Sequence, residues 1–105
     1  MGKAENYVEH YLRDRVKQHR GLCYKFTSGV NGVPDRVVIL NGHIAWVETK
    51  APGKKPDALQ LVRHKEMRAA GADVRVIDTR EQVDELIQEL TGNTGRWRAP
   101  PSHPI

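Results

Sequence analysis

Two acidic residues and a lysine near the middle of the chain have the types and spacing for hydrolytic chemistry. Asp35 begins an apolar run, and Glu48 and Lys50 end the next one. Asn41-Gly42, between the runs, is a strong signal for a two-residue β-hairpin turn. With this turn, Asp35 lies directly opposite Glu48, which places their Cβ atoms about 4.5–5.5 Å apart. Lys50 is two residues beyond Glu48, so its side chain leaves the same face.

Two carboxylates this close repel each other unless a cation lies between them. Oxygen ligands with few geometric constraints suit Mg²⁺ or Mn²⁺. A metal held by Asp35 and Glu48 would polarise a phosphate and lower the pKa of a bound water. Lys50 would orient that water or neutralise the developing negative charge. The pattern therefore predicts phosphodiester hydrolysis; the alternative is a surface hairpin with a salt bridge between Glu48 and Lys50.

The elements that must position these side chains follow from the hydrophobic periodicity. It predicts helices over 3–19, 57–70 and 80–90, and strands over 22–27, 35–40, 43–50 and 73–78. The first three strands are expected to form an antiparallel meander, and the segment 43–78 a right-handed parallel crossover. The order α-β-β-β-α-β-α thus predicts an α/β fold, a mixed sheet flanked by helices.

Length and composition narrow the class of protein. The 105 residues suit one domain, expected over 1–91, followed by a disordered tail over 92–105 that is rich in proline and glycine. Cys23 is the only cysteine, which excludes an internal disulfide. No apolar run approaches the roughly 18 residues that a membrane span needs, so we expect a cytoplasmic protein without a membrane partner. The net charge of +4 is a mild bias towards polyanions.

Several motifs together resemble the VRR-NUC branch of the PD-(D/E)XK nucleases, over about residues 5–90. They are G-V-P-D-R-V-V-I at 32–39, V-E-T-K-A-P-G at 47–53, Gln60 on the next helix, and Ala70-Gly71 at its end. The resemblance implies a restriction-endonuclease-like core and an endonuclease that depends on Mg²⁺ or Mn²⁺. It also implies that Asp35 and Glu48 are metal ligands and that Lys50 is the catalytic lysine.

The resemblance further implies that a glutamate of the first helix reaches the metal site. Glu5 and Glu9 are both candidates because residues four apart share a helix face. Glu5 is favoured, since its spacing to Val8 and Leu12 resembles that of the family. The alternative for each is a solvent-facing helix acid.

Other polar residues are candidates for supporting roles. Gln60 is expected to return to the site and hold a water or a phosphate oxygen. Lys25 and Ser28 match the family pattern and are candidates for contacts with the DNA backbone. Four basic residues between the second acid and the end of the next helix are further phosphate-binding candidates: Lys54, Lys55, Arg63 and Lys65. The alternative for these side chains is a solvated surface.

The resemblance implies a small stand-alone enzyme of phage or bacterial type, in the cytoplasm of a bacterial or phage-infected host cell. Its expected substrate is branched DNA, such as a four-way junction, and its expected form is a homodimer, which makes two symmetric cuts. The interface would use either the third helix, with Val83, Leu86, Ile87 and Leu90, or the first, with Tyr7 and Tyr11; otherwise both helices simply cover the sheet. The alternative functions are a non-catalytic nucleic-acid-binding module and a flap or nicking nuclease.

Overall fold

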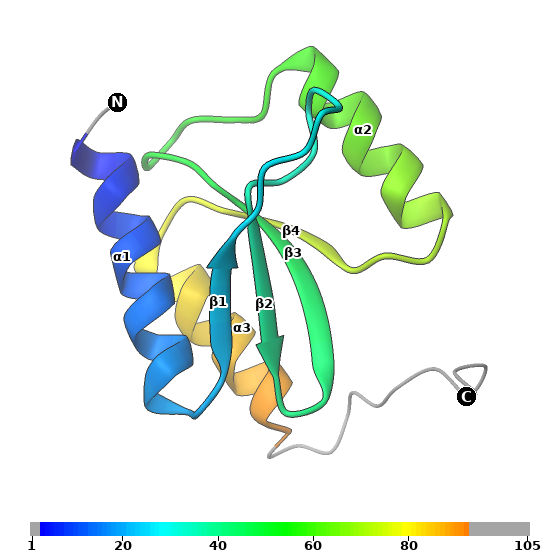
Figure 1. The fold of residues 1–105 in the computed structure, drawn as a ribbon. Helices are drawn as coiled ribbons and strands as arrows, with labels where there is room; N and C mark the ends of the chain where they lie inside the picture. Colours follow the sequence, from blue (N-terminus) through cyan, green and yellow to red (C-terminus); the bar gives the residue numbers. More distant parts are fainter. Residues whose placement is uncertain (1–2, 93–105) are drawn as a thin grey trace.

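The computed structural model describes the backbone of residues 3–92 and the side chains of residues 7–92 (Figure 1). Its elements, in order, are α1 (Lys3–Gln18), β1 (Leu22–Lys25), β2 (Arg36–Leu40), β3 (His43–Thr49), α2 (Ala58–Ala69), β4 (Val74–Ile77) and α3 (Arg80–Thr91). The predicted order α-β-β-β-α-β-α is confirmed. The tail predicted over 92–105 lies, beyond Gly92, outside the described residues.

The four strands form one mixed sheet in the order β1-β2-β3-β4. β1, β2 and β3 pair antiparallel, whereas β3 and β4 pair parallel across the segment that contains α2. The β2–β3 turn is the predicted one: Asn41 and Gly42 both have positive φ, 53° and 81°, as a two-residue turn of this kind requires. Leu40 therefore pairs with His43, which fixes the register of the hairpin.

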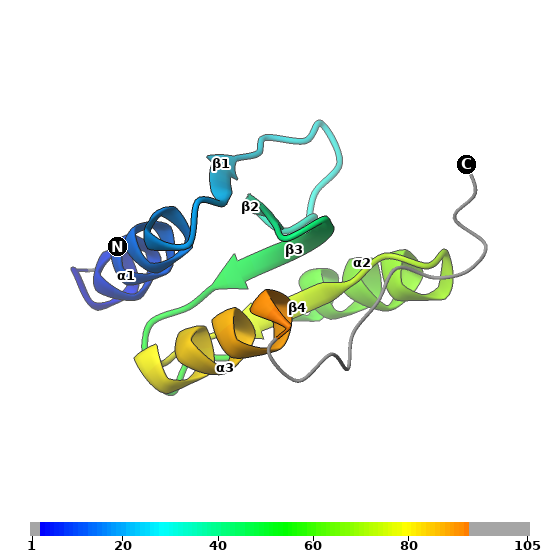
Figure 2. The same ribbon diagram turned by 90° about the horizontal axis from the view of Figure 1, so that it is seen from below.

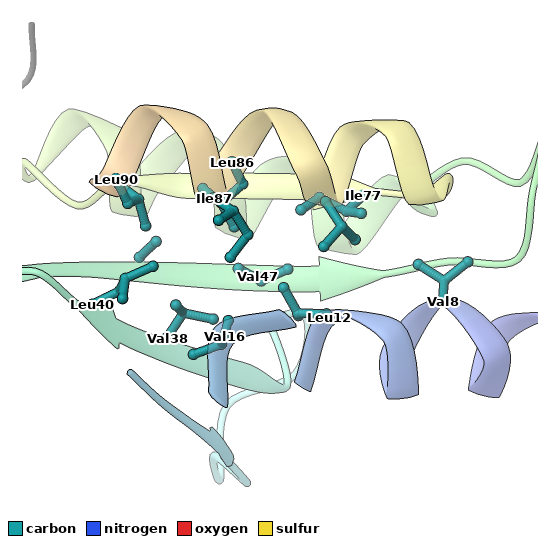
Figure 3. Close-up of a cluster of buried hydrophobic side chains, with 12 residues drawn as sticks. Val8, Leu12, Val16, Val38, Leu40, Val47, Ile77, Leu86, Ile87 and Leu90 are labelled. Carbon is teal, nitrogen blue, oxygen red and sulfur yellow. The ribbon is translucent and has the colours of Figure 1, made fainter. Parts of the chain in front are cut away.

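The hydrophobic core lies between the sheet and two helices. Figure 2 shows α1 and α3 on the same side of the sheet, and Figure 3 shows their side chains meeting those of β2 and β3. α1 contributes Val8, Leu12 and Val16, which recur every four residues on one helix face, and all three are buried. α3 contributes its apolar stripe, Val83, Leu86, Ile87 and Leu90, all of them buried in the same cluster. The expectation that this stripe forms an intermolecular interface is therefore wrong, because it covers the sheet.

The opposite face of the sheet is covered less completely. Cys23 packs against the core, so its neighbours Leu22 and Tyr24 point to this opposite face, where they are 46% and 54% exposed. Ile44 precedes the buried Ala45 in β3 and is 51% exposed on the same opposite face. α2 lies on this side (Figure 2), and its residue Gln60 contacts Glu48 near the end of β3.

Capping residues fix where two helices begin. Thr79 is the N-cap of α3, and its hydroxyl accepts a hydrogen bond from the Gln82 amide. Asp57, predicted as the first helical residue, is instead the N-cap of α2. Among the described residues, no helix is long and apolar enough to span a membrane.

Candidate active site

The hairpin register brings the two predicted acids to the same end of the sheet. Pairing runs from Leu40 and His43 to Arg36 and Val47. Asp35 and Glu48 are the next residues on their strands, so they occupy the next opposed position, as the turn predicted. Asp35 lies just before β2, where its carbonyl accepts a hydrogen bond of 2.8 Å from the Phe26 amide.

The carboxyl group of Asp35 is in an unfavourable environment for a negative charge. Burial raises the pKa of Asp35 and the nearby charge of Glu9 raises it further, whereas Lys25 and Arg36 act in the opposite direction. The Oδ1 atom is buried and has no hydrogen-bond partner among the described residues. A buried oxygen in this state is suited to a cation that the protein itself does not supply.

Gln60 and Lys50 both contact the carboxylate of Glu48. Glu48 is 5% exposed, and its Oε2 atom accepts a hydrogen bond of 3.2 Å from Gln60 Nε2. The Lys50 ammonium lies 3.6 Å from the same oxygen. Glu48, Lys50 and Gln60 therefore converge at one place, as the sequence predicted for these three side chains.

The capping box of α2 orients Gln60. Its backbone amide donates to Asp57 Oδ1, at 2.8 Å, and its side-chain Oε1 accepts from the Asp57 amide, at 3.0 Å. Because Oε1 is occupied by an N–H donor, the NH₂ group must be the end that faces Glu48. The helix start thus delivers a hydrogen-bond donor to the site in a fixed orientation.

Of the two candidate glutamates on α1, only Glu9 has a side chain within the described part of the structure. Glu5 lies in the first turn of α1, and its side chain is outside the described part of the structure. Glu9 is buried, and its Oε2 accepts from both Arg36 Nε and Arg36 Nη2, each at 2.7 Å. Lys25 Nζ lies 3.9 Å from the same oxygen. The alternative of a solvent-facing acid is therefore wrong for Glu9.

The loop before Asp35 is fastened to α2. Arg63 Nε donates to the Asn31 carbonyl at 2.9 Å, and Arg63 Nη1 contacts Glu66 Oε1 at 2.7 Å. Gly32, with φ 91°, approaches the helix so closely that a Cβ atom there would lie 2.9 Å from the Leu59 carbonyl oxygen. Arg63 thus has a structural contact that the sequence did not reveal, and its contact with DNA stays a prediction.

The remaining candidates for DNA contact lie on the surface. Lys54 and Lys55 are exposed in the loop before α2, and Lys65 is exposed on α2 itself. The Lys25 side chain is 64% exposed, and Ser28 Oγ accepts from the Val30 amide at 2.9 Å. These positions leave the ammonium groups accessible to a polyanion.

Two buried histidines differ in their surroundings and in their hydrogen-bond partners. His43 begins β3, at the far end of the strand from Glu48, and its Nε2 lies 2.5 Å from Asp73 Oδ2. His64 is buried on α2, one turn after Gln60, and neither ring nitrogen has a partner among the described residues. Burial lowers the pKa of His64, and the charges of Arg68 and Lys50 lower it further. Its four-residue spacing from Gln60 is the sequence feature that could have placed His64 beside the site.

The donor set can be tested against the metal that the site implies. No group of three or more histidine, cysteine or acidic side chains among the described residues is arranged to hold a metal. Mg²⁺ commonly binds through one or two carboxylates while it keeps waters and takes substrate phosphates. Asp35, with its buried unpaired oxygen, and Glu48, at the next opposed position, fit that mode.

The fold and the pairing of Asp35 with an E-x-K strand define a nuclease-like site, and the comparisons with known proteins agree. The chain is 46% identical over 79 residues to "Putative nuclease p44" of Acyrthosiphon pisum secondary endosymbiont phage 1, covering 73% of this chain and 85% of the phage protein. A solved structure described as "VRR_NUC domain" superposes with a TM-score of 0.75 at 39% identity, covering 83% of this chain and 97% of that one. No protein-family model matches the sequence.

The chain belongs to the VRR-NUC family of nucleases, in the PD-(D/E)XK superfamily. The resemblance in the motifs around Asp35 and Glu48 is thereby confirmed at the level of the family, as is the fold that it implied. The roles of the individual site residues stay predictions.

Proposed function

We propose that the protein is an endodeoxyribonuclease that depends on Mg²⁺ or Mn²⁺ and hydrolyses phosphodiester bonds in branched DNA, such as four-way junctions. The observation that carries the proposal is the contact of Lys50 and Gln60 with Glu48, at the end of the β2–β3 hairpin where the register continues from the Arg36–Val47 pair to Asp35 and Glu48. A non-catalytic nucleic-acid-binding module would gain nothing from two carboxylates beside a phosphate, because they repel it.

The site residues have two roles: some would bind the metal ion, and the others orient the water, neutralise charge or position a ligand. Asp35 and Glu48 would hold the metal, which supplies an acidified water and stabilises charge on the phosphoryl oxygens. Lys50 orients the attacking water, or neutralises the negative charge that develops beside it. Gln60 keeps Glu48 in place through the 3.2 Å hydrogen bond.

The DNA backbone would lie over the site end of the sheet. Lys54, Lys55 and Lys65 present exposed charges beside it, and Lys25 presents another near Asp35. Contacts of this kind bind phosphates without reading the sequence. They position the duplex and leave the choice of substrate to the shape of the DNA.

The proposed homodimer would give the two symmetric cuts that a junction needs. The stripe of α3 is buried, whereas Tyr7 of α1 is 53% exposed, so the α1 alternative stays a prediction. The surface that we assign to the second copy is the exposed apolar set on the opposite sheet face, Leu22, Tyr24 and Ile44. A monomer would favour the alternative of a flap or nicking nuclease, which needs one cut.

The direct test of substrate is a panel of end-labelled DNAs of equal length: duplex, nicked duplex, flap, splayed arm and four-way junction. We expect symmetric incisions near the junction point with Mg²⁺ or Mn²⁺, and none with EDTA. Faster cleavage of flaps or nicks would replace the junction proposal. DNA binding without any metal-dependent cleavage would support the binding-module alternative.

A further inference from the structure

A buried ion pair lies directly behind the first acid of the site. Glu9 is 9% exposed and Arg36 is 8% exposed. Two guanidinium nitrogens, Nε and Nη2, approach the same Glu9 oxygen at 2.7 Å. Removing two charges from water offsets most of their attraction, so such a pair contributes little net stability. We therefore examine how the pair fixes the positions of the residues beside it.

The Glu9–Arg36 pair joins α1 to the start of β2, directly after Asp35. Arg36 is the first residue of β2 and follows Asp35 directly, and Glu9 follows the core residue Val8 on α1. On its other flank, the backbone of Asp35 is held by the Phe26 amide, at 2.8 Å. The backbone of Asp35 is therefore held from both β1 and α1.

The carboxylate of Asp35 has little support of its own, since its buried Oδ1 has no partner among the described residues. A metal ligand must nevertheless be kept in a narrow range of positions, and the groups behind a ligand usually provide this. Among the described residues, the Glu9–Arg36 ion pair and the Phe26 amide are the groups placed to do so.

We propose that Glu9 is a positioning residue that acts through Arg36 to hold Asp35 for metal binding, and is not itself a metal ligand. The assignment rests on the proposed metal-dependent function. Glu9 Oε2 already faces the Arg36 guanidinium and, at 3.9 Å, the Lys25 ammonium. The Oε2 oxygen is therefore engaged by two cations of the protein itself, and the double-mutant cycle below tests whether the carboxylate also binds the metal directly.

The test is a double-mutant cycle of Glu9→Gln, Arg36→Met and the double variant. The first readout is the affinity for Mn²⁺, taken from the rise of the melting temperature with Mn²⁺ concentration. The second is the single-turnover rate of junction cleavage at saturating Mn²⁺ and 25 °C. Each single variant should weaken Mn²⁺ binding about tenfold, because loss of a group that supports a ligand has this size of effect. The double variant should be no weaker than the singles, since both act through one contact.

A matched control is the ion pair of Arg15 and Asp84, which joins α1 to α3 at 3.1 Å. Arg15→Met and Asp84→Asn should lower the metal-free melting temperature and leave Mn²⁺ affinity unchanged. If Arg36→Met does not fold, Arg36→Lys takes its place in the cycle. Lys keeps the charge but lacks the second donor of the guanidinium, so a weakening of a few-fold is expected.

Two results would overturn the assignment alone. If Glu9→Gln weakens Mn²⁺ binding as much in the Arg36→Met background as in the parent, Glu9 binds the metal directly. If Mn²⁺ affinity and rate are unchanged in folded variants while the metal-free melting temperature falls, the pair is only structural. A parent protein whose melting temperature does not respond to Mn²⁺ would overturn the proposed function and this assignment together.

Discussion

Asp35 carries an electrostatic penalty in the metal-free protein. Burial and the charge of Glu9 raise its pKa above the ordinary range, so the folded state binds a proton at this position more tightly than the unfolded state does. Stability linked to Asp35 is therefore present at pH values below its unfolded pKa and is lost as pH rises through the folded pKa. At pH 7 the ionised carboxylate opposes folding unless a cation neutralises it.

Replacing this carboxylate tests the penalty. Without divalent ions at pH 7, Asp35→Asn should melt at a higher temperature than the parent, and the difference should shrink as the buffer is made acidic. With excess Mn²⁺ the order should reverse, because only the parent gains binding energy. Thermal melts at several pH values, with and without Mn²⁺, measure both effects. A lower metal-free melting temperature for Asp35→Asn at pH 7 would contradict the account.

Variants of Glu48 and Lys50 should distinguish the loss of metal binding from the loss of the cleavage step. Glu48→Ala should lose both the Mn²⁺ response and nearly all cleavage. Lys50→Ala should keep the Mn²⁺ response, because lysine is not a ligand, but lose cleavage by roughly a hundredfold or more. The measurements are Mn²⁺-dependent melting and single-turnover cleavage, with the exposed Glu85→Ala as control. Robust cleavage by Lys50→Ala would remove its catalytic role.

The positions of some site side chains could be predicted from the sequence, and those of others could not. The contact of Lys50 with Glu48, and the place of Asp35 at the same end of the hairpin, could be predicted because hairpin pairing follows from one short turn. The burial of Glu9 could not, since its neighbour Val8 already defines the apolar face of α1. Its partner Arg36 lies 27 residues away, and only the packing of α1 on the sheet brings the two together.

Among the elements, the β2–β3 hairpin and α2 build the site between them. The hairpin supplies both acids, and the N-terminal turn of α2 supplies Gln60. The hairpin was predictable because the apolar strands and the Asn41-Gly42 turn agree. The route of the loop between Phe26 and Asp35 was not, because it depends on the tertiary contact of Arg63 with the Asn31 carbonyl.

The capping box of α2 should matter for cleavage beyond its effect on stability. Asp57→Ala and Thr79→Ala each remove an N-cap and should each lower the free energy of unfolding by about 1 kcal/mol. Only Asp57→Ala frees the Gln60 side chain, so only it should slow cleavage several-fold at 25 °C. Denaturant unfolding and single-turnover assays provide the comparison. Equal cleavage by both variants would mean that the orientation of Gln60 is unimportant.

On the scale of the whole molecule, the basic residues should set the salt dependence of DNA binding. Reversing Lys54 and Lys55 to glutamate should weaken binding to every DNA alike. It should also reduce the slope of log affinity against log salt by about two, if each lysine contacts one phosphate. The exposed Lys17 and Arg20, at the opposite end of α1, serve as matched controls. An unchanged slope for the Lys54 and Lys55 variant would assign these residues to the solvated surface.

The assembly can be tested on the open sheet face. The chain has a mass of 11.9 kDa, so light scattering near 10 µM should give about twice that value for the proposed homodimer. Ile44→Lys should yield monomers, whereas Val62→Lys, at a comparably exposed position on α2, should not. A monomeric parent would favour flaps or nicks as substrates. A dimer insensitive to Ile44→Lys would place the interface elsewhere.

We propose that Asp35 belongs to a metal-dependent centre that cuts DNA. This role can be tested by cleavage of a labelled four-way junction by the parent and by Asp35→Ala, purified identically and compared with Mn²⁺ and with EDTA. We expect incision by the parent with Mn²⁺ alone, and a loss of nearly all incision in Asp35→Ala although it remains folded. Mn²⁺-dependent incision by Asp35→Ala at the parent's rate would contradict it.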